Sequence, residues 1–379
     1  MLKKALFALA AAALVTSAAA QIKVGVVSSA TGPAAAIGVP QKNTVSLLPK
    51  IIAGYTVDYQ ILVDGGDPTA AVSATKKLIG EQQVDVIFAN TTVPNTIAMI
   101  PFAADSGTPM IAPVGSMLVV APMNAQKKWA FKTTQNDDVA AEILFAHMVK
   151  QGVKTLGVIT TSDPYGGNWE KEAQRLAQQQ GVRIVANEKF NRVDTSVTAQ
   201  ALKLVAAKPD AVLIAAPGAP SLLPHVALAD RGYRGQIYQS HGAAMDLFRK
   251  QGGRKVEGAI VVGSMMMVLA EIPDSNPSKK VMREYVTAYE KAFGEASPFG
   301  SQAYDAGLLF ANAVPAAAQK AKPGTPEFRA ALRDALEATR DLVGTQGRYT
   351  MSPQDHSGMD RKGAAELMTI RNGQWTRAR

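Results

Sequence analysis

Hydroxyl side chains stand directly after a short apolar run, at Asn90-Thr91-Thr92. The run, Val84–Ala89, is long enough for a strand buried on both faces, and Pro94 stands where a first helical residue would be. A second apolar run, Pro109–Val114, ends in Gly115-Ser116. Hydroxyl donors beside the N–H groups of a helix N-terminus suit a small anion such as a carboxylate. The alternative is that the threonines only cap a helix.

Motifs of common enzyme classes do not accompany these hydroxyls. The glycine spacing that lets a pyrophosphate approach the backbone is missing after Val84–Ala89. No GxSxG, GxxxxGK[ST] or HExxH pattern occurs. A match to S-x-x-K, Ser73 to Lys76, lies in an ordinary amphipathic helical pattern. We therefore expect a binding protein with no catalytic residue, no metal and no cofactor.

The first twenty residues are typical of a cleaved signal peptide. Lys3 and Lys4 form a basic start, Ala5–Val15 an apolar core, and Ala18-Ala19-Ala20 a small-residue cleavage site. The apolar core is too short to span a bilayer as a helix, so we expect no stable membrane insertion. The sequence has no cysteine, which excludes a lipid anchor on an N-terminal cysteine. Export to a periplasm is the simplest interpretation.

Length and composition indicate a globular protein of two domains. Removal of 20 from 379 residues leaves 359, more than one average domain. The chain is 47% hydrophobic and 19% charged, and its net charge of +9 becomes +7 without Lys3 and Lys4. Because Lys and Arg are dispersed among Asp and Glu, we expect no nucleic-acid partner.

Short apolar runs alternate with helical patterns along most of the chain. Strands are predicted at Ile22–Ser28, Thr56–Val63, Leu156–Thr160 and Ala211–Ala216, with helices between them. This rhythm predicts an α/β fold with parallel sheets covered by helices on both faces. Periodicity leaves open two lobes or one barrel, and the helical block after Pro277 favours two lobes.

Four stretches together resemble one family. They are IKVGVVSSATGPAAAIG (22–38), GGDPTAAVSATKKLI (65–79), TPMIAPVGS (108–116) and TSDPYGGN (161–168). The sequence resembles the solute-binding proteins of branched-chain amino acid type ABC transporters, the leucine/isoleucine/valine-binding group. The resemblance covers essentially all of residues 22–379, with its landmarks in the same order.

That resemblance implies two Rossmann-like lobes, doubly wound parallel sheets joined by three crossovers, with the ligand in a cleft between them. Lobe one would comprise residues 22–135 and 266–342, and lobe two residues 136–265 and 343–379. The hinges would lie near 132–135, 263–266 and 342–345. Closure by a hinge motion would bury the ligand and present a joined surface to a membrane permease.

The resemblance also implies site residues. The carboxylate-holding hydroxyl falls on Thr92, with Thr91 beside it, and the backbone contact and second hydroxyl fall on Val114 and Ser116, with Gly115 between them. The aromatic clamp from lobe two falls on Tyr165, which could instead be an ordinary loop tyrosine.

At two positions the sequence departs from the family pattern. A second expected tyrosine is replaced by Gly218-Ala219. The acidic residue that would pair with the ligand ammonium is replaced by His241. A neutral imidazole cannot supply the counter-charge of a buried ammonium, whereas it can bond a hydroxyl, keto or carboxylate oxygen. If His241 lines the cleft, and is not a structural loop histidine, a carboxylate without the α-amino group, such as an aromatic or 2-oxo acid, fits these residues better than leucine, isoleucine or valine.

These residues lead to one expected function and two alternatives. We expect capture of an aromatic or 2-oxo acid, or of a hydrophobic amino acid, for an ABC importer. The first alternative is a branched-chain amino acid binding protein proper. The second is a periplasmic ligand sensor, because the same lobes serve both purposes.

Overall fold

The computed structural model describes residues 21–89, 92–361, 363 and 365–378. The predicted signal peptide, residues 1–20, and the predicted site residue Thr91 lie outside the described residues. No helix among those residues is both long and apolar enough to cross a membrane.

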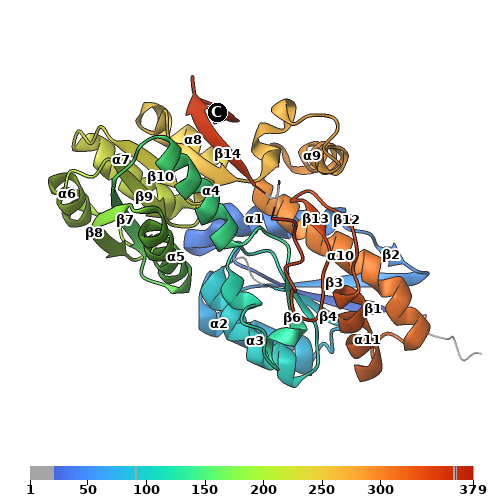
Figure 1. The fold of residues 1–379 in the computed structure, drawn as a ribbon. Coiled ribbons are helices and arrows are strands. Elements are labelled where there is room, and N and C mark those ends of the chain that lie inside the picture. The colour runs from blue at the N-terminus through green and yellow to red at the C-terminus, as the bar shows by residue number, and fades with distance from the viewer. Residues whose placement is uncertain (1–20, 90–91, 362, 364, 379) are drawn as a thin grey trace, which may run out of the picture.

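A six-stranded sheet forms the first lobe, in the order β2-β3-β1-β4-β5-β6 (Figure 1). Its strands are β1 (Ile22–Ser28), β2 (Ile51–Ile52), β3 (Tyr55–Val63), β4 (Val86–Phe88), β5 (Met110–Ala112) and β6 (Ala130–Lys132). All neighbours pair in parallel except β2 with β3. The fully buried strands β4 and β5 are continuous apolar runs because helices cover both faces of the sheet.

Helices pack on both faces of this first sheet. One face carries α2 (Pro68–Gly80) and α3 (Val93–Asp105), which share a buried cluster with Val27 of β1. The opposite face carries α10 (Pro298–Lys320) and α11 (Pro326–Glu337), which pack with Val24 and Val26. Helix α1 (Ala35–Thr44) lies against α10.

A seven-stranded sheet forms the second lobe, in the order β15-β14-β11-β10-β9-β7-β8. Its strands are β7 (Thr155–Thr161), β8 (Arg183–Phe190), β9 (Ala211–Ala215), β10 (Gln236–Gln239), β11 (Ile260–Gly263), β14 (Glu366–Arg371) and β15 (Gln374–Arg377). Strands β14 and β15 form the hairpin predicted around Asn372-Gly373 and add to β11 in antiparallel fashion. Two separate sheets confirm the predicted α/β fold with two lobes and exclude a single barrel.

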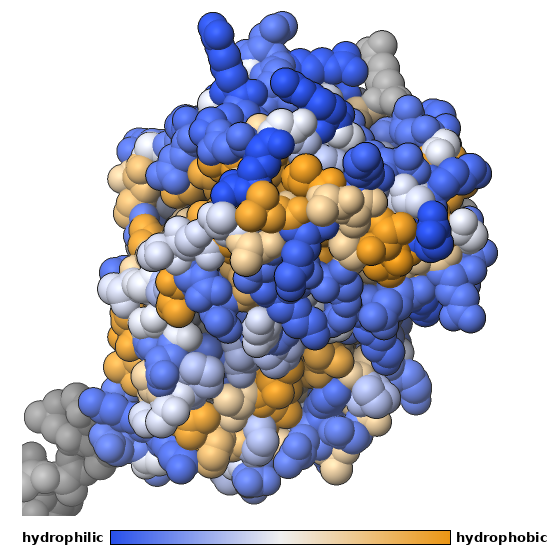
Figure 2. All heavy atoms as spheres, turned by 90° about the vertical axis from the view of Figure 1, so that its left-hand side faces the viewer, coloured by the Kyte–Doolittle hydropathy of each residue, from blue (hydrophilic) through white to orange (hydrophobic). Residues whose placement is uncertain are grey.

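Helices also cover both faces of the second sheet. Helices α4 (Asp137–Lys150) and α5 (Pro164–Gln180) share one buried cluster, and α6 (Thr198–Ala206) and α7 (Leu222–Asp230) pack with Ile159 and Ile214. Helices α8 (Asp246–Gly252) and α9 (Ser278–Phe293) join a third cluster beside β11. Hydrophilic side chains dominate the outer face of this lobe, with separate hydrophobic patches between them (Figure 2).

The chain crosses between the sheets after β6, after β11 and after Met359, which still packs against the core of the first sheet. The third crossing differs from the expected boundary at 342–345. Strands β12 (Leu342–Val343) and β13 (Arg348–Tyr349) pair with each other, and Tyr349 and Met351 are buried in the core of the first sheet. Residues 343–351 therefore pack with lobe one, because their apolar side chains contribute to its core.

Candidate ligand-binding site

A cavity of about 390 Å³ lies between the two sheets, where the carboxyl ends of their parallel strands meet. Ligands of open α/β sheets bind at this edge. The first lobe lines it with Ile37, Thr92, Val93, Pro113, Val114, Gly115, Phe299 and Gln302, and the second lobe with Tyr165, Arg192, Pro217, His241 and Gly242. Thr134, from the first crossing, completes the wall. Apolar side chains thus surround a few polar groups.

Three predicted residues of the first lobe line this cavity from the ends of β4 and β5. Thr92 is buried in extended backbone at the N-cap of α3, and its side chain does not cap the helix. Pro94 stands in the first turn of α3, as predicted. Val114 and Gly115 follow β5 on the neighbouring wall. This arrangement can hold an anion.

Ser116 and Ala219 are not among the residues that line the cavity. Ser116 accepts a hydrogen bond from Leu118 N at 3.3 Å, and its hydroxyl also bonds Asp137. Its polar group therefore supports the wall from behind. Pro217 and Gly242 line the cavity at the place expected for Ala219, which begins the turn into α7.

The ring of Tyr165 is buried on the second-lobe wall, in the first turn of α5. Its hydroxyl donates to Ser240 Oγ at 2.9 Å, and its ring meets His241 edge-on with 5.7 Å between centroids. Burial raises the pKa of Tyr165 far above its usual range, so the phenol stays neutral. Asp163 caps the same helix by accepting from Tyr165 N and Gly166 N.

The sequence reasoning missed Arg192, which follows β8. Its Nε donates to Asp163 Oδ2 at 2.5 Å, and its side chain is 16% exposed. Its Nη2 is buried and has no partner among the described residues, although Arg192 lines the cavity. A guanidinium is suited to carboxylate recognition. The sequence signal for Arg192 was a basic residue directly after a strand. It was overlooked because Lys and Arg are dispersed along the whole chain.

His241 lines the cavity from the end of β10, as its predicted role requires. Its Nε2 lies 3.6 Å from Oδ1 of the fully buried Asp137. Burial lowers the pKa of His241 to about 3, with a further lowering by the nearby charge of Lys132. The imidazole is therefore neutral at physiological pH.

Lys132 and Asp137 are both buried behind this wall, close enough for their charges to interact. Burial lowers the pKa of Lys132 and raises that of Asp137, and each group's charge opposes the shift of the other. Lys132 Nζ donates to the Thr134 carbonyl and, at 2.6 Å, to Asn136 Oδ1. These bonds fix the chain where it leaves β6 for α4.

Buried polar atoms without a protein partner gather on residues of the cavity wall. Within the described part of the chain they include Arg192 Nη2, His241 Nδ1 and Thr134 Oγ1. Leaving such atoms unpaired costs about 1–3 kcal/mol each. No Asp or Glu is present among the described residues that line the cavity. The arrangement suits a small acid with an apolar body.

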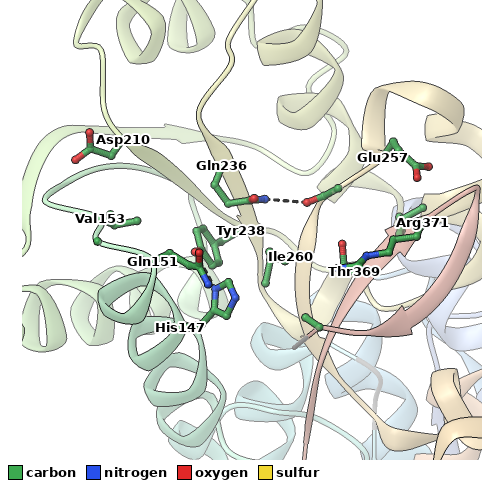
Figure 3. A pocket seen from close by; sticks show the side chains of 14 residues that line it. His147, Gln151, Val153, Asp210, Gln236, Tyr238, Glu257, Ile260, Thr369 and Arg371 are labelled. Carbon is green, nitrogen blue, oxygen red and sulfur yellow. Dashed lines mark hydrogen bonds between the residues drawn. The ribbon is translucent and has the colours of Figure 1, made fainter.

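A larger pocket of about 1400 Å³ lies at the opposite edge of the second sheet (Figure 3). Its polar groups already serve the fold: Gln236 donates to the Gly258 carbonyl at 2.9 Å, and His147 Nδ1 lies 2.9 Å from the Tyr238 hydroxyl. Asp210 accepts from Lys154 N and Thr155 N. This edge holds the amino ends of β7, β9 and β10, so we do not assign the ligand site here.

Fold and cavity define the chain as a two-lobed binding protein with its site between the lobes. It belongs to the periplasmic binding protein family, whose model matches residues 21–374. It resembles the Leu/Ile/Val-binding protein homolog 3 of Brucella melitensis, with 22% identity and 89% of each chain covered. These findings confirm the family indicated by the sequence.

Solved structures of ligand-binding proteins also resemble this chain. An extracellular ligand-binding receptor from Rhodopseudomonas palustris HaA2 is 42% identical, with 95% of this chain and 100% of that chain covered and a TM-score of 0.92. A solute-binding protein of an R. palustris ABC transporter, in complex with benzoate, is 18% identical, with coverages of 94% and 95% and a TM-score of 0.80. The second match, at its low identity, supports the fold alone. The family and fold are those of solute-binding proteins and not those of enzymes.

Proposed function

We propose that this protein is the periplasmic solute-binding component of an ABC importer and that it captures a small organic carboxylate. Residues 1–20 direct export and are then removed. The lobes, residues 22–135 with 266–359 and residues 136–265 with 366–378, close around the ligand by a hinge motion, and the closed form delivers it to a membrane permease.

The carboxylate assignment depends mainly on Arg192. Arg192 lines the cavity, and its Nη2 is buried without a partner in the described chain, so a ligand oxygen could complete its hydrogen bonding. On the opposite wall, Thr92 and the N-terminus of α3 supply further donors. Val93, Pro113 and Phe299 provide apolar contacts for the body of the ligand.

The absence of a carboxylate among the described lining residues favours an acid without an α-ammonium group. A buried ammonium would meet the neutral His241 and the cationic Arg192, with no lining carboxylate among the described residues to balance its charge. Aromatic and 2-oxo acids satisfy this condition. One relative was solved in complex with benzoate, which is compatible with an aromatic acid, whereas the name of the Brucella relative favours leucine, isoleucine or valine.

A thermal-shift screen of refolded, ligand-free protein tests the proposal. Benzoate-type acids and 2-oxo acids should raise the melting temperature, because a ligand that binds only the folded state stabilises it. Arg192→Met should abolish the shift. Arg175→Met, which removes an exposed ion pair on the same lobe, should retain it. A shift by leucine, isoleucine or valine alone would reject the ligand class, and no shift by any carboxylate would reject the function.

A further inference from the structure

The orientation of His241 is restricted on several sides. Its Nε2 faces Asp137 Oδ1 at 3.6 Å, and its ring packs against Tyr165 and Trp169 with 5.7 Å between centroids in each case. Gly115 lies so close that a Cβ there would come within 2.3 Å of Nε2. Packing holds the plane of the ring, and polarity selects its flip state, because a flip would replace Nε2 by a carbon beside the carboxylate.

Apart from the negative charge of the neighbouring Asp138, the groups around Asp137 act as hydrogen-bond donors or as a positive charge. Asn168 Nδ2 donates to its Oδ2 at 2.8 Å, the Ser116 hydroxyl bonds its carboxylate, and Lys132 supplies a nearby positive charge. With these neighbours, the Asp137 carboxylate has to act as a hydrogen-bond acceptor. Oδ1 is buried with no hydrogen-bond partner among the described residues, and the ring nitrogen beside it is His241 Nε2. The imidazole proton is therefore best placed on Nε2, from which it points at Oδ1.

A neutral imidazole with its proton on Nε2 leaves Nδ1 as a hydrogen-bond acceptor. This Nδ1 is buried and has no partner in the described chain, while His241 lines the cavity. We propose that the Asp137–His241 pair makes Nδ1 a built-in acceptor for a ligand hydroxyl, so that the preferred ligand is a hydroxylated carboxylic acid. The inference rests on the proposed function, since it assigns a second polar group to the same carboxylate ligand.

This assignment narrows the ligand class. A keto oxygen or a methyl ether has no proton to donate and would face the lone pair of Nδ1 without a bond. An unsubstituted acid would leave Nδ1 unpaired. A hydroxyl satisfies the nitrogen without introducing a charge, unlike an ammonium group. His241 then distinguishes acids by whether they carry a hydroxyl proton. With that proton the buried Nδ1 is hydrogen-bonded, and without it Nδ1 stays unpaired.

Titration calorimetry on ligand-free protein tests the preference with two matched series. The aromatic series compares benzoate, 3- and 4-hydroxybenzoate and their methyl ethers. The aliphatic series compares 4-methylpentanoate with its 2-hydroxy and 2-oxo derivatives. The hydroxyl form should bind at least about ten-fold more tightly than its partners in one series. If ethers or oxo acids bind as tightly as hydroxy acids, the inference is wrong while the proposed function stands. If no carboxylate binds, both are wrong.

A variant and a spectroscopic measurement complete the test. His241→Phe should remove the preference for the hydroxyl while the unsubstituted acid still binds. His147→Phe, on the same lobe but away from the cavity, should leave the preference unchanged. Long-range ¹H–¹⁵N spectra of the ligand-free protein should show the His241 proton on Nε2. A proton on Nδ1, or a hydroxyl preference that survives in His241→Phe, would overturn the assignment.

Discussion

Gly115 and His241 approach each other so closely across the cavity that any side chain on Gly115 would collide with the imidazole. A Cβ on Gly115 would lie 2.3 Å from His241 Nε2 and 2.6 Å from its Cε1. Gly115 follows β5 of the first sheet, and His241 follows β10 of the second. The glycine is thus required for a close approach between lobes.

Gly115→Ala should weaken ligand binding by about ten-fold or more. The rigid imidazole cannot move aside, so the lobes must separate slightly, and overpacking of this kind costs about 1–3 kcal/mol. Calorimetry measures the affinity, and small-angle X-ray scattering should report a larger radius of gyration with ligand. Gly80→Ala, with nothing within 4 Å of the added Cβ, is the matched control. Unchanged affinity in Gly115→Ala would contradict the close-approach argument.

Thr92→Ala should weaken carboxylate binding by about 1.5–3 kcal/mol, which is ten-fold or more, because it removes a hydroxyl beside the N-terminus of α3. Calorimetry with the acid found in the screen is the measurement. Thr75→Ala removes a buried hydroxyl of α2 in the same lobe, one that bonds Ala71 O and lies away from the cavity. Equal affinities of the two variants would remove Thr92 from the site.

The sequence predicted the fold well because its signals are local. Buried parallel strands such as β4 and β9 are unbroken apolar runs, and caps such as Asp163 mark helix starts. The third crossing was misplaced because Tyr349 and Met351 become part of the first core only through tertiary packing. No local pattern distinguishes them from residues of the other lobe.

The structure places in one cavity wall those predicted residues that follow a strand end in a recognisable motif. Thr92, Val114, Tyr165 and His241 all line the cavity. Ser116 was predicted to bind the ligand, but its hydroxyl bonds Asp137 and Leu118, a choice set by the approach of α4. Arg192 was missed because only the fold shows that its Nη2 is buried at the cavity while Nε pairs with Asp163.

Lys132→Met should destabilise the protein by about 3–5 kcal/mol, because it leaves the buried Asp137 without a nearby counter-charge. Asp137→Asn should also destabilise it, since Lys132 then loses its partner. The loss of unfolding free energy in the double variant should be smaller than the sum of the two single losses, by about 0.5–3 kcal/mol. Urea unfolding at neutral pH gives all three values. Strict additivity would mean that the two charges do not stabilise each other.

Asp305, on α10, should make stability depend on pH in the acid range. It accepts from Thr345 N at 2.7 Å and Gln346 N at 2.9 Å, and Tyr349 Oη lies 2.7 Å from its Oδ2. Burial nevertheless raises its pKa from 3.8 to about 6. At pH values between 3.8 and about 6, the Asp305 carboxyl is therefore protonated in the folded chain but ionised in the unfolded chain. The contribution of Asp305 to the unfolding free energy therefore decreases as pH rises from about 4 to about 6.

Asp305→Asn removes this titration, so comparison with wild type isolates it. The unfolding free energy of wild type minus that of the variant should fall by on the order of 3 kcal/mol as pH rises from about 4 to about 6.5, as measured by urea unfolding. Asp210→Asn is the control. Hydrogen bonds from Lys154 and Thr155 lower the pKa of Asp210, so its contribution is lost only below about pH 4 and its difference curve should be flat in this window. A flat or rising curve for Asp305→Asn would show that burial does not dominate its ionisation.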